Sequence, residues 1–478
     1  MRKFYLLLFI LLLFLLSFTI NTFQADNFQN KFKWIKDVGA KKMPSIKNVY
    51  LANDFGAIGD SITINTFAIQ KVIDKCFEDG GGIVKFLPGK YVTGSIFLKE
   101  NVVLQIDSGV YILGSENIDD YKEIFTRVAG IEMMWPAALI NILNKRNVAI
   151  IGKGIIDGRG KVFWDKYWRM RNEYESKNLR WIVDYDCKRP RLILIDNSEN
   201  ITIKRLNLKE PGFWTVHVLY SRYVTLDGLI IRNNISGKGP STDGIDIDSS
   251  SKILVQNCDI DCNDDNFCLK AGRDADGLRV NRPCEYVFIR NCISRKGAGL
   301  ITLGSETSGG IRNVYVKDMK AFGTSSGIRI KSAKNRGGTI ENIYIENLFM
   351  DSVAIAFNLT LNWNPAYSYS SLPEGYNYDT LPYHWKVMLH KVPEEIGLPI
   401  VKNIYVNKVK AINVNQAFNI QGLENSIPEN FVLNNIEIEA KSAGLIENSR
   451  NIIFNNLNLK TLDKSKFNLI NSSNIIIN

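Results

Sequence analysis

The sequence lacks several features that would point to other kinds of protein. It has seven cysteines in 478 residues and no Cys-x-x-Cys pair, so a complete disulfide framework is not expected. No run of like charges resembles a nucleic-acid-binding arm, and no nucleic-acid partner is expected. No Pro-, Gly- or Ser-rich linker divides the chain. The absences favour one large domain, and the 45% hydrophobic content can supply its core.

Only one long apolar run is present, and it lies at the N-terminus. Arg2 and Lys3 precede apolar residues 4–18, an order typical of an export signal. The run is slightly shorter than the roughly 20 apolar residues that span a bilayer. No cysteine follows it, so a lipoprotein anchor is not expected. Cleavage near Ala25 would release the rest of the chain.

The sequence leaves one alternative to cleavage open. Phe23 is not the small residue usually found two positions before the end of a signal peptide. Residues 1–25 are therefore interpreted as a signal peptide or an N-terminal anchor, and residues 26–478 as the catalytic domain. We expect an exported protein, periplasmic or extracellular, with no stable membrane association after signal cleavage.

Charge and cysteine positions each allow two interpretations. The formal net charge is +10 and is spread along the chain, which suits an acidic partner or simply reflects a basic proteome. Five of the seven cysteines lie between Cys258 and Cys292. We favour stacked buried thiols, with one or two disulfide bridges as the alternative.

An imperfect repeat is the main organisational signal. A short run of β-branched and aromatic residues recurs, usually after asparagine, and most starts lie 21 to 34 residues apart. The copies start at Asn147, Asn200, Tyr223, Lys252, Tyr286, Asn313, Asn342, Asn403, Asn430, Asn451 and Asn474. The gap of 61 residues from Asn342 to Asn403 is interpreted as two turns with a long loop.

Short strands at this period, without long helices, predict an all-β solenoid. Alternate apolar positions would fill a continuous core, and strands of successive coils would stack at about 4.8 Å. Asparagine at the strand entrance suits a left-handed backbone bend. A β-propeller fits this period less well, because a four-stranded blade needs about 40 residues. We therefore predict a parallel β-helix.

Three stretches depart from the repeat. Residues 66–77 have helical periodicity, with Ile69, Val72 and Ile73 on one face, and would cap the N-terminal end of the core. Residues 161–189 are rich in tryptophan and arginine, and residues 361–385 are rich in tryptophan and tyrosine. Both are interpreted as long loops on one rim. Their aromatics either stack on sugar rings and close one end of a cleft, or only pack the loops down.

Three segments carry candidate chemistry: residues 240–248, 263–270 and 327–331. In the first, alternation sends Asp246 and Asp248 away from the core. In the third it sends Arg329 and Lys331 outward together. The acidic segments lie about one coil apart, and the basic pair follows about two coils later. All of them are therefore expected on one outer face.

Clustered carboxylates suit glycoside hydrolysis. Like charges raise the pKa of at least one carboxyl, which can then act as a general acid while an ionised neighbour activates water. Arg329 and Lys331 would bind a substrate carboxylate. Two other interpretations remain open for these residues. Asp264-Asp265 resembles an ordinary solvated turn, and Asp243, Asp246 and Asp248 could bind calcium.

Several motifs resemble those of the polygalacturonase family of glycoside hydrolases, family 28. The resemblance runs from about Asp54 to at least Gly338. Its marks are Asp54-Phe55-Gly56-Ala57-Ile58-Gly59-Asp60, Gly152-Lys153-Gly154-Ile155-Ile156-Asp157-Gly158, Ser241-Thr242-Asp243-Gly244, Asp264-Asp265, Gly304-Ser305-Glu306-Thr307-Ser308-Gly309-Gly310 and Arg329-Ile330-Lys331.

The resemblance implies a right-handed, single-stranded parallel β-helix that hydrolyses α-galacturonosidic linkages with inversion, without a metal or other cofactor. It implies that Asp264 is the general acid and that Asp243 and Asp265 hold and activate water. It also implies that Arg329 and Lys331 bind galacturonate. Lys270 and Ser241 are further candidates for substrate binding.

Two positions differ from the family pattern. Ser241 stands where asparagine is common, and Ala298 stands where a supporting histidine is common. The leading prediction is an exo-acting galacturonosidase that is a monomer, with an acidic pectic polysaccharide or oligosaccharide as partner. The alternatives are a rhamnogalacturonan or branched-pectin hydrolase, a calcium-dependent pectate lyase, and a non-catalytic glycan-binding β-helix.

Overall fold

The computed structural model describes residues 32–45 and 48–478. The predicted export segment, residues 1–25, lies outside the described residues. The chain divides after Val38 into two units. Of the first, the structure describes one 3₁₀ helix, η1 (Lys33–Asp37). Throughout the described residues, every helix is too short or too polar to cross a membrane.

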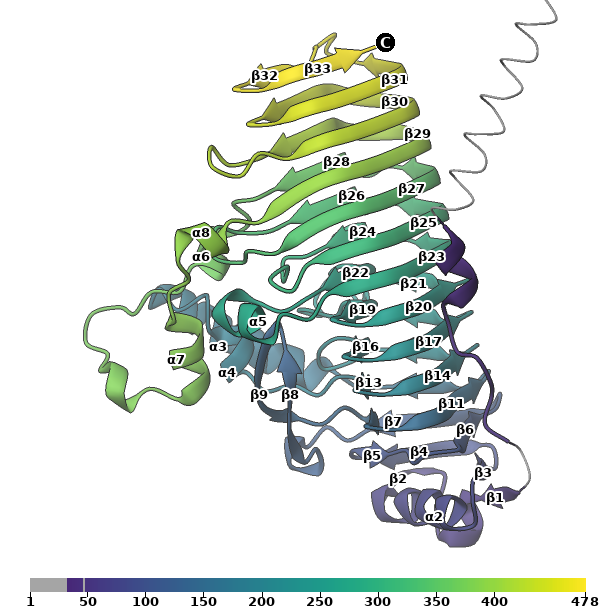
Figure 1. The fold of residues 1–478 in the computed structure, drawn as a ribbon. Helices are drawn as coiled ribbons and strands as arrows, with labels where there is room; N and C mark the ends of the chain where they lie inside the picture. Colours follow the sequence, from purple (N-terminus) through teal and green to yellow (C-terminus); the bar gives the residue numbers. More distant parts are fainter. Residues whose placement is uncertain (1–31, 46–47) are drawn as a thin grey trace, which may run out of the picture. The chain divides into compact units, whose positions relative to one another are not determined.

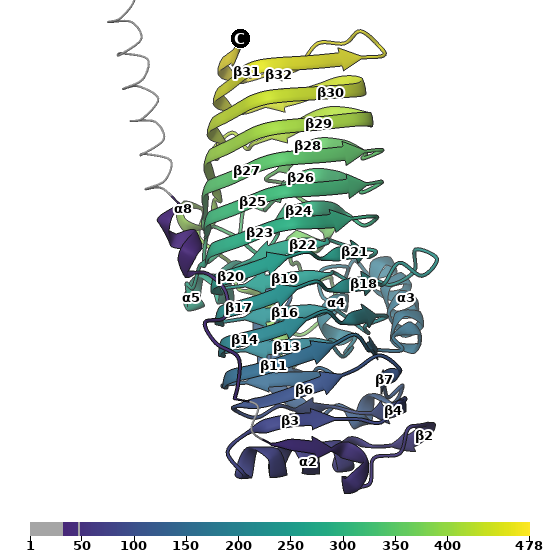
Figure 2. The same cartoon turned by 90° about the vertical axis from the view of Figure 1, so that its right-hand side faces the viewer.

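The second unit, residues 39–478, is a right-handed parallel β-helix, as predicted (Figures 1 and 2). Its strands stack in register on three faces, named A, B and C in the order in which each coil visits them. Face A begins with β1 (Val49–Leu51), β3 (Gly82–Lys85), β6 (Val102–Ile106), β11 (Arg146–Gly152), β14 (Glu199–Lys204), β17 (Arg222–Asp227) and β20 (Ser251–Gln256).

Face B consists at first of short separate strands, which pair from coil to coil. They are β2 (Asp60–Ile64), β4 (Gly89–Thr93), β7 (Val110–Gly114), β12 (Ile155–Asp157), β15 (Asn207–Lys209), β18 (Ile230–Arg232) and β21 (Asp259–Asp261). In later coils one long strand bends from face A onto face B. These are β23 (Cys284–Ser294), β25 (Ile311–Phe322), β27 (Thr339–Asp351), β29 (Ile400–Gln421), β30 (Glu429–Glu447) and β31 (Arg450–Thr461), and β33 (Ser473–Ile477) ends face A.

Face C carries the candidate residues. Its strands are β5 (Ile96–Phe97), β10 (Ile140–Leu143), β13 (Ile193–Asp196), β16 (Val216–Leu219), β19 (Ile245–Asp248), β22 (Phe267–Lys270), β24 (Gly299–Leu303), β26 (Ser326–Lys331), β28 (Ile355–Thr360) and β32 (Asn468–Ile470). Parts of β29 and β30 continue this face between β28 and β32.

Successive coils fill the core with equivalent residues. Ile201, Val224 and Ile253 occupy one register position in three neighbouring coils, and all three are fully buried. Every predicted repeat start has a positive φ, from Asn474 at 53° to Asn430 and Lys252 at 60°. The asparagines therefore serve the left-handed corners that the sequence predicted.

The N-terminal cap is also confirmed. Helix α2 (Thr66–Glu78) buries Ile69, Val72, Ile73 and Cys76, the face that the periodicity predicted. These side chains belong to the same hydrophobic core as the first coils. Figure 1 shows α2 across the end of the column. Apolar surface that the first coil would otherwise expose is thus covered.

The interpretation of the 61-residue gap as two turns is wrong. Ile343 in β27 pairs directly with Ile404 in β29, so the gap is one coil with a long insertion. The insertion leaves face C after β28 and returns at Ile400. It contains α6 (Pro365–Ser368), η4 (Tyr378–Thr380), α7 (Tyr383–Leu389) and α8 (Glu394–Gly397).

The stretch 161–189 is likewise more than a loop. It forms α3 (Lys161–Ser176) and α4 (Val183–Asp186), and α3 buries Phe163, Trp164 and Tyr167. These three side chains lie on one face of the helix and can be buried together. Such a pattern favours a helix over a loop. With the antiparallel hairpin β8 (Glu123–Val128) and β9 (Ile131–Pro136), the insertions gather on one side of the column (Figure 1).

The remaining helices are short connections, namely η2 (Ala52–Phe55), η3 (Ile118–Asp120) and α5 (Asp274–Val280). All seven cysteines are free and buried, so the favoured interpretation of stacked thiols holds. The Cys258 amide even donates to Sγ of Cys292 one coil later, at 3.3 Å.

Candidate active site

The predicted acidic and basic residues converge on face C. Asp246 in β19, Cys268 in β22, Thr302 in β24 and Arg329 in β26 occupy one outward row in four successive coils. The predicted spacing is therefore confirmed: the two acidic segments lie on adjacent coils, and the basic pair lies two coils beyond. Asp243 and Asp264 stand where the chain enters face C.

Asp265 is the most completely bonded carboxylate of the site. Its Oδ1 lies 2.9 Å from a guanidinium nitrogen of Arg329 and accepts from the Thr302 hydroxyl at 2.7 Å. Its Oδ2 lies 2.7 Å from Nζ of Lys331. The two basic residues, predicted to bind substrate, thus form ion pairs with the buried Asp265. They still border the cleft, and 16% of the Arg329 side chain is exposed.

Lys270 is the centre of a second, buried cluster. Its Nζ lies 3.2 Å from Glu306, 3.5 Å from Asp246 and 3.8 Å from Asp243. The indole ring of Trp214 lies 4.8 Å from the same ammonium group. One ammonium group therefore faces three carboxyl groups, which together would carry a net charge of −2 if all three were ionised. Such repulsion favours protonation of at least one of them.

The carboxyl groups consequently have very different pKa values. Burial and the charge of Asp265 raise the pKa of Asp264. Burial, Asp246 and Asp264 raise the pKa of Asp243 well above its usual value. Burial alone would also raise the pKa of Asp265, but Lys331 and Arg329 outweigh it and hold that pKa far below the usual range. Carboxyl groups separated in this way can serve as acid and base in one site.

Asp246 and Asp248 do leave the core, as predicted, but both are completely buried beneath other side chains. Asp248 lies 3.0 Å from Arg127 and 3.5 Å from His217. Asp246 accepts no hydrogen bond from the described residues, and burial raises its pKa to about 8. Asp243 and Asp246 both lie near Lys270, and Asp248 lies beside Arg127, so cationic side chains already neighbour all three aspartates, which does not suit the calcium alternative.

The cleft above these residues has a volume of about 280 Å³. Asp243, Asp264, Lys270, Arg329 and Lys331 all line it, and so do Ser241 and Ala298. The two insertions add part of the wall, with Arg171, Arg180, Asp184, Trp363, Asn364 and Tyr367. Asp265 lies beneath the surface and does not line the cleft.

Direct contacts tie the two insertions together beside the cleft. The Arg180 guanidinium lies 5.1 Å from the Tyr367 ring, and the rings of Trp181 and Trp385 meet edge to face at 5.4 Å. Asp186 accepts hydrogen bonds from Trp385 at 3.0 Å and from Tyr174 at 2.9 Å. A second hydrophobic cluster, separate from the main core, surrounds these contacts.

The residues allow a test for a metal. Among the described residues, donor atoms of Asp243, Asp265 and Cys268 lie within 4.8 Å of one another. Arg329 and Lys331 already occupy both oxygens of Asp265, and Lys270 lies near Asp243. Burial also raises the pKa of the Cys268 thiol well above its usual value, so it stays protonated. Cationic side chains, rather than a metal ion, fit this set of ligands.

Several site residues were not predicted as such. Glu306 lies inside a motif that carried the family resemblance, yet nothing in the motif indicated its contact with Lys270. Trp214 and His217 lie in an ordinary coil, and Arg127 comes from the β8–β9 hairpin. Their roles depend on how hairpin and coils pack, which no repeat pattern encodes. His217 is fully buried, and burial lowers its pKa to about 4.

Comparisons with known proteins agree with this geometry. The model of the glycosyl hydrolases family 28 matches residues 98–365. A probable polygalacturonase of Vitis vinifera is 30% identical over 396 residues, covering 80% of this chain and 73% of the relative. An exo-poly-alpha-D-galacturonosidase of Dickeya chrysanthemi is 27% identical over 460 residues, covering 88% and 72%.

The fold agrees as well. The crystal structure of an exopolygalacturonase from Thermotoga maritima superposes with a TM-score of 0.72 at 24% identity, covering 94% of this chain and 95% of that one. A polygalacturonase from Erwinia carotovora gives a TM-score of 0.61 at 23% identity, covering 92% and 98%. These likenesses concern the fold, and the relatives in sequence carry the functional argument.

Proposed function

This chain belongs to the glycosyl hydrolases of family 28, and from that premise we propose that it cleaves α-galacturonosidic linkages in pectin with inversion, from the end of the chain. Hydrolysis rests on the family and on relatives named polygalacturonase. The lyase and non-catalytic alternatives find no comparable support. The observation that carries the proposal is the trio of aspartates with widely separated pKa values on face C.

Asp264 is the general acid of the proposed mechanism. It lines the cleft, and its raised pKa keeps a proton available. It would transfer this proton to the glycosidic oxygen as the bond to the anomeric carbon breaks, so that the leaving sugar departs as a neutral alcohol.

Asp243 and Asp265 hold the attacking water. One oxygen of each lies within 4.8 Å of the other, a separation that one water can bridge with two ordinary hydrogen bonds. The water attacks the anomeric carbon from the side opposite the leaving oxygen and gives its proton to this pair. The product is then a saturated galacturonate with inverted anomeric configuration.

Arg329 and Lys331 couple substrate binding to this step. Without substrate, both side chains form ion pairs with Asp265. A galacturonate carboxylate beside them would share their charge, so the pKa of Asp265 would rise and the group would become a stronger base. Trp363 lies 4.4 Å from Nζ of Lys331 and offers a ring face to the sugar. Lys270 and Ser241 border the same space.

The exo mode follows from the insertions. Arg180 and Tyr367 come from different insertions, meet, and line the cleft together. A wall built from two insertions that pack on each other would stop a polymer from passing through and would select chain ends. We further propose that the protein acts as an exported monomer, since its polymeric substrate is too large to enter a cell.

Product analysis tests the proposal. Protein lacking residues 1–25 is incubated with oligogalacturonides and with rhamnogalacturonan fragments, and Asp264→Asn serves as the control. We expect saturated monomer from the first time points, no unsaturated product, and no effect of chelator. The control should turn over about 10²–10⁴-fold more slowly, the usual contribution of a general acid.

Other outcomes would redirect the assignment. Preferred cleavage of rhamnogalacturonan would move the enzyme to that branch of the family. Early internal cleavage, seen as a rapid loss of viscosity, would contradict the exo mode. Equal inertness of both proteins across a pectin panel would overturn the hydrolase assignment.

A further inference from the structure

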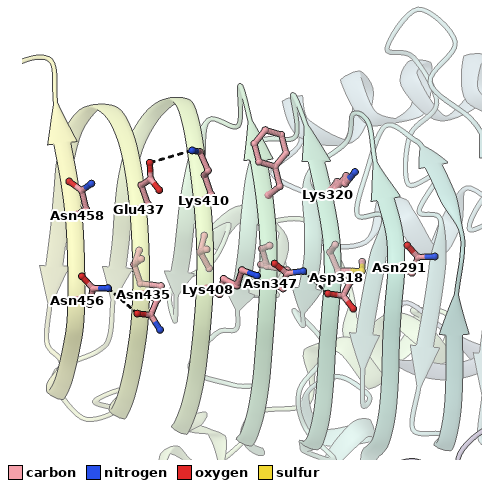
Figure 3. A pocket seen from close by; sticks show the side chains of 15 residues that line it. Asn291, Asp318, Lys320, Asn347, Lys408, Lys410, Asn435, Glu437, Asn456 and Asn458 are labelled. Carbon is pink, nitrogen blue, oxygen red and sulfur yellow. Dashed lines mark hydrogen bonds and ion pairs between the residues drawn. The ribbon is translucent and has the colours of Figure 1, made fainter.

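A further cavity lies away from the active site. It is a groove of about 650 Å³ along the corner between faces A and B. It crosses six neighbouring strands, from β23 to β31 (Figure 3). At about 4.8 Å per strand its length is on the order of 24 Å, and none of its lining residues borders the catalytic cleft. We call it the corner groove.

The floor of the corner groove is a polar ladder of left-handed corner residues, with φ between 51° and 60°. The ladder consists of Asn291, Asp318, Asn347, Lys408, Asn435 and Asn456. Neighbouring amides bond to each other, for example Asn456 to Asn435 at 2.9 Å. Lys408 is the one cation in this row, and its side chain is exposed.

A second row runs beside the ladder, two residues further along each strand. There Lys320, Phe349, Lys410 and Glu437 follow one another in successive coils. Phe349 is half-buried between two exposed lysines. A ring with a cation on either side, about 10 Å apart over two coils, can stack on a sugar while both cations reach its acidic neighbours.

The acids of the groove are already engaged with their own neighbours. Glu437 lies 3.4 Å from Lys410, and Asp318 accepts from the Asn347 amide at 2.5 Å. Among the described residues, Lys320 and Lys408 have no ion-pair partner. The groove therefore presents uncompensated positive charge together with amides and an aromatic ring.

We propose that the corner groove binds a polyanionic, carboxylate-bearing polysaccharide outside the catalytic cleft. The length suits several units of an extended polymer, the amides can bond hydroxyl groups, and the lysines match repeated carboxylates. The proposal rests on the proposed function only for the choice of polymer, polygalacturonate. The groove would keep the enzyme on a polymer while one chain end occupies the cleft.

The test uses Asp264→Asn protein, so that the probe is not consumed. Binding is measured by retardation in gels that contain polygalacturonate, at low and high salt. The groove variant is Lys320→Gln with Lys408→Gln and Lys410→Gln. We expect about tenfold weaker binding of the polymer, since several charge contacts are lost together. Binding of a short oligogalacturonide, which needs only the cleft, should not change.

A matched control removes the same charge elsewhere. Lys441→Gln with Lys464→Gln and Lys466→Gln alters three exposed lysines outside the groove and should leave polymer binding nearly unchanged. Equal weakening by both triple variants would overturn the proposal, because net charge alone would explain it. Unchanged binding by the groove variant would overturn it as well. Because the assay needs no turnover, its result is independent of whether pectin is cleaved.

Phe349→Ala provides a second readout. It should weaken polymer binding even at high salt, when charge contacts are screened. If fully methyl-esterified pectin binds as tightly as polygalacturonate and the lysine variant does not matter, the groove recognises a neutral glycan and the proposal is wrong.

Discussion

At the residue scale, the site depends on a few cations that each serve more than one acid. Lys270 contacts three carboxylates and is almost fully buried. Arg329 and Lys331 share Asp265. Such groups are costly to bury unless they are paired, so the stability of the fold and the proposed catalysis depend on the same contacts.

Lys270→Gln should destabilise the protein strongly. The change leaves the ionised carboxylate of Glu306 buried without the ammonium group 3.2 Å away, and the loss of one partner of a buried pair costs about 3–5 kcal/mol. Chemical denaturation at neutral pH measures the effect. Lys270→Arg, which keeps the charge, should retain most of the stability. A glutamine variant as stable as the parent would show that other cations, such as Lys331 and Arg336, compensate the charge of Glu306 without Lys270.

Asp246 should make stability depend on pH. Its folded pKa is about 8, whereas an unfolded aspartate titrates near 3.9. Between these values the folded protein holds a proton that the unfolded chain has lost, so this carboxyl lowers stability as pH rises from about 4 to about 8. Asp246→Asn should remove that decline, an effect on the order of a few kcal/mol.

Thermal unfolding of parent and Asp246→Asn protein at pH 5 and pH 8 measures this. The melting temperature of the variant, relative to that of the parent, should be higher at pH 8 than at pH 5. Parallel curves would show that Asp246 is ionised in the folded protein.

At the scale of elements, the coils and the insertions differ in how far sequence predicts them. The repeat marks each corner, because a left-handed residue must recur there, and eleven starts all have positive φ. The cap helix α2 was equally visible, since its buried face repeats with helical period. Asp243, Asp264 and Asp265, the proposed catalytic residues, belong to motifs that lie within these repeats.

The sequence contains no comparable signal for the structure of the two insertions. The stretch after β28 was interpreted as a second turn because its length suits one, whereas β27 pairs directly with β29. Trp181 and Trp385, 204 positions apart in the sequence, meet only because both insertions leave the same side of the column. Contacts of this kind depend on tertiary packing, so the wall of the cleft could not be predicted.

Asp186 links the insertion that contains α3 and α4 to the insertion that follows β28. Its carboxylate accepts from Tyr174 and Trp385 and contacts His384 at 2.5 Å. Asp186→Ala should free residues 366–390 and make them sensitive to limited proteolysis, with little change in the melting of the coils. The ratio of internal to terminal cleavage should rise. Asp379→Ala, an exposed change in the same insertion, is the control and should have neither effect.

At the scale of the whole molecule, the formal charge of +10 favours encounters with a polyanion. Salt screens such attraction, since the Debye length falls from about 30 Å at 0.01 M to about 10 Å at 0.1 M. The kcat/KM for polygalacturonate should fall about tenfold over the range from low to moderate salt. Steady-state rates at several salt concentrations measure it.

Methyl-esterified pectin carries fewer charges and provides the comparison. Its kcat/KM should depend much less on salt. If both substrates respond equally, ionic strength acts on the catalytic groups and not on long-range attraction.

The pairing of each coil with its direct neighbours also has a mechanical consequence. Coils are held by strands that lie mostly 21 to 34 residues apart in the sequence, and few contacts reach beyond the adjacent coil. If the column is pulled from its two ends, force should detach one coil at a time. Each step would release on the order of 70–120 Å of extended chain. The coil with the long insertion would give a longer step, and a force–extension trace would therefore reveal its place in the column.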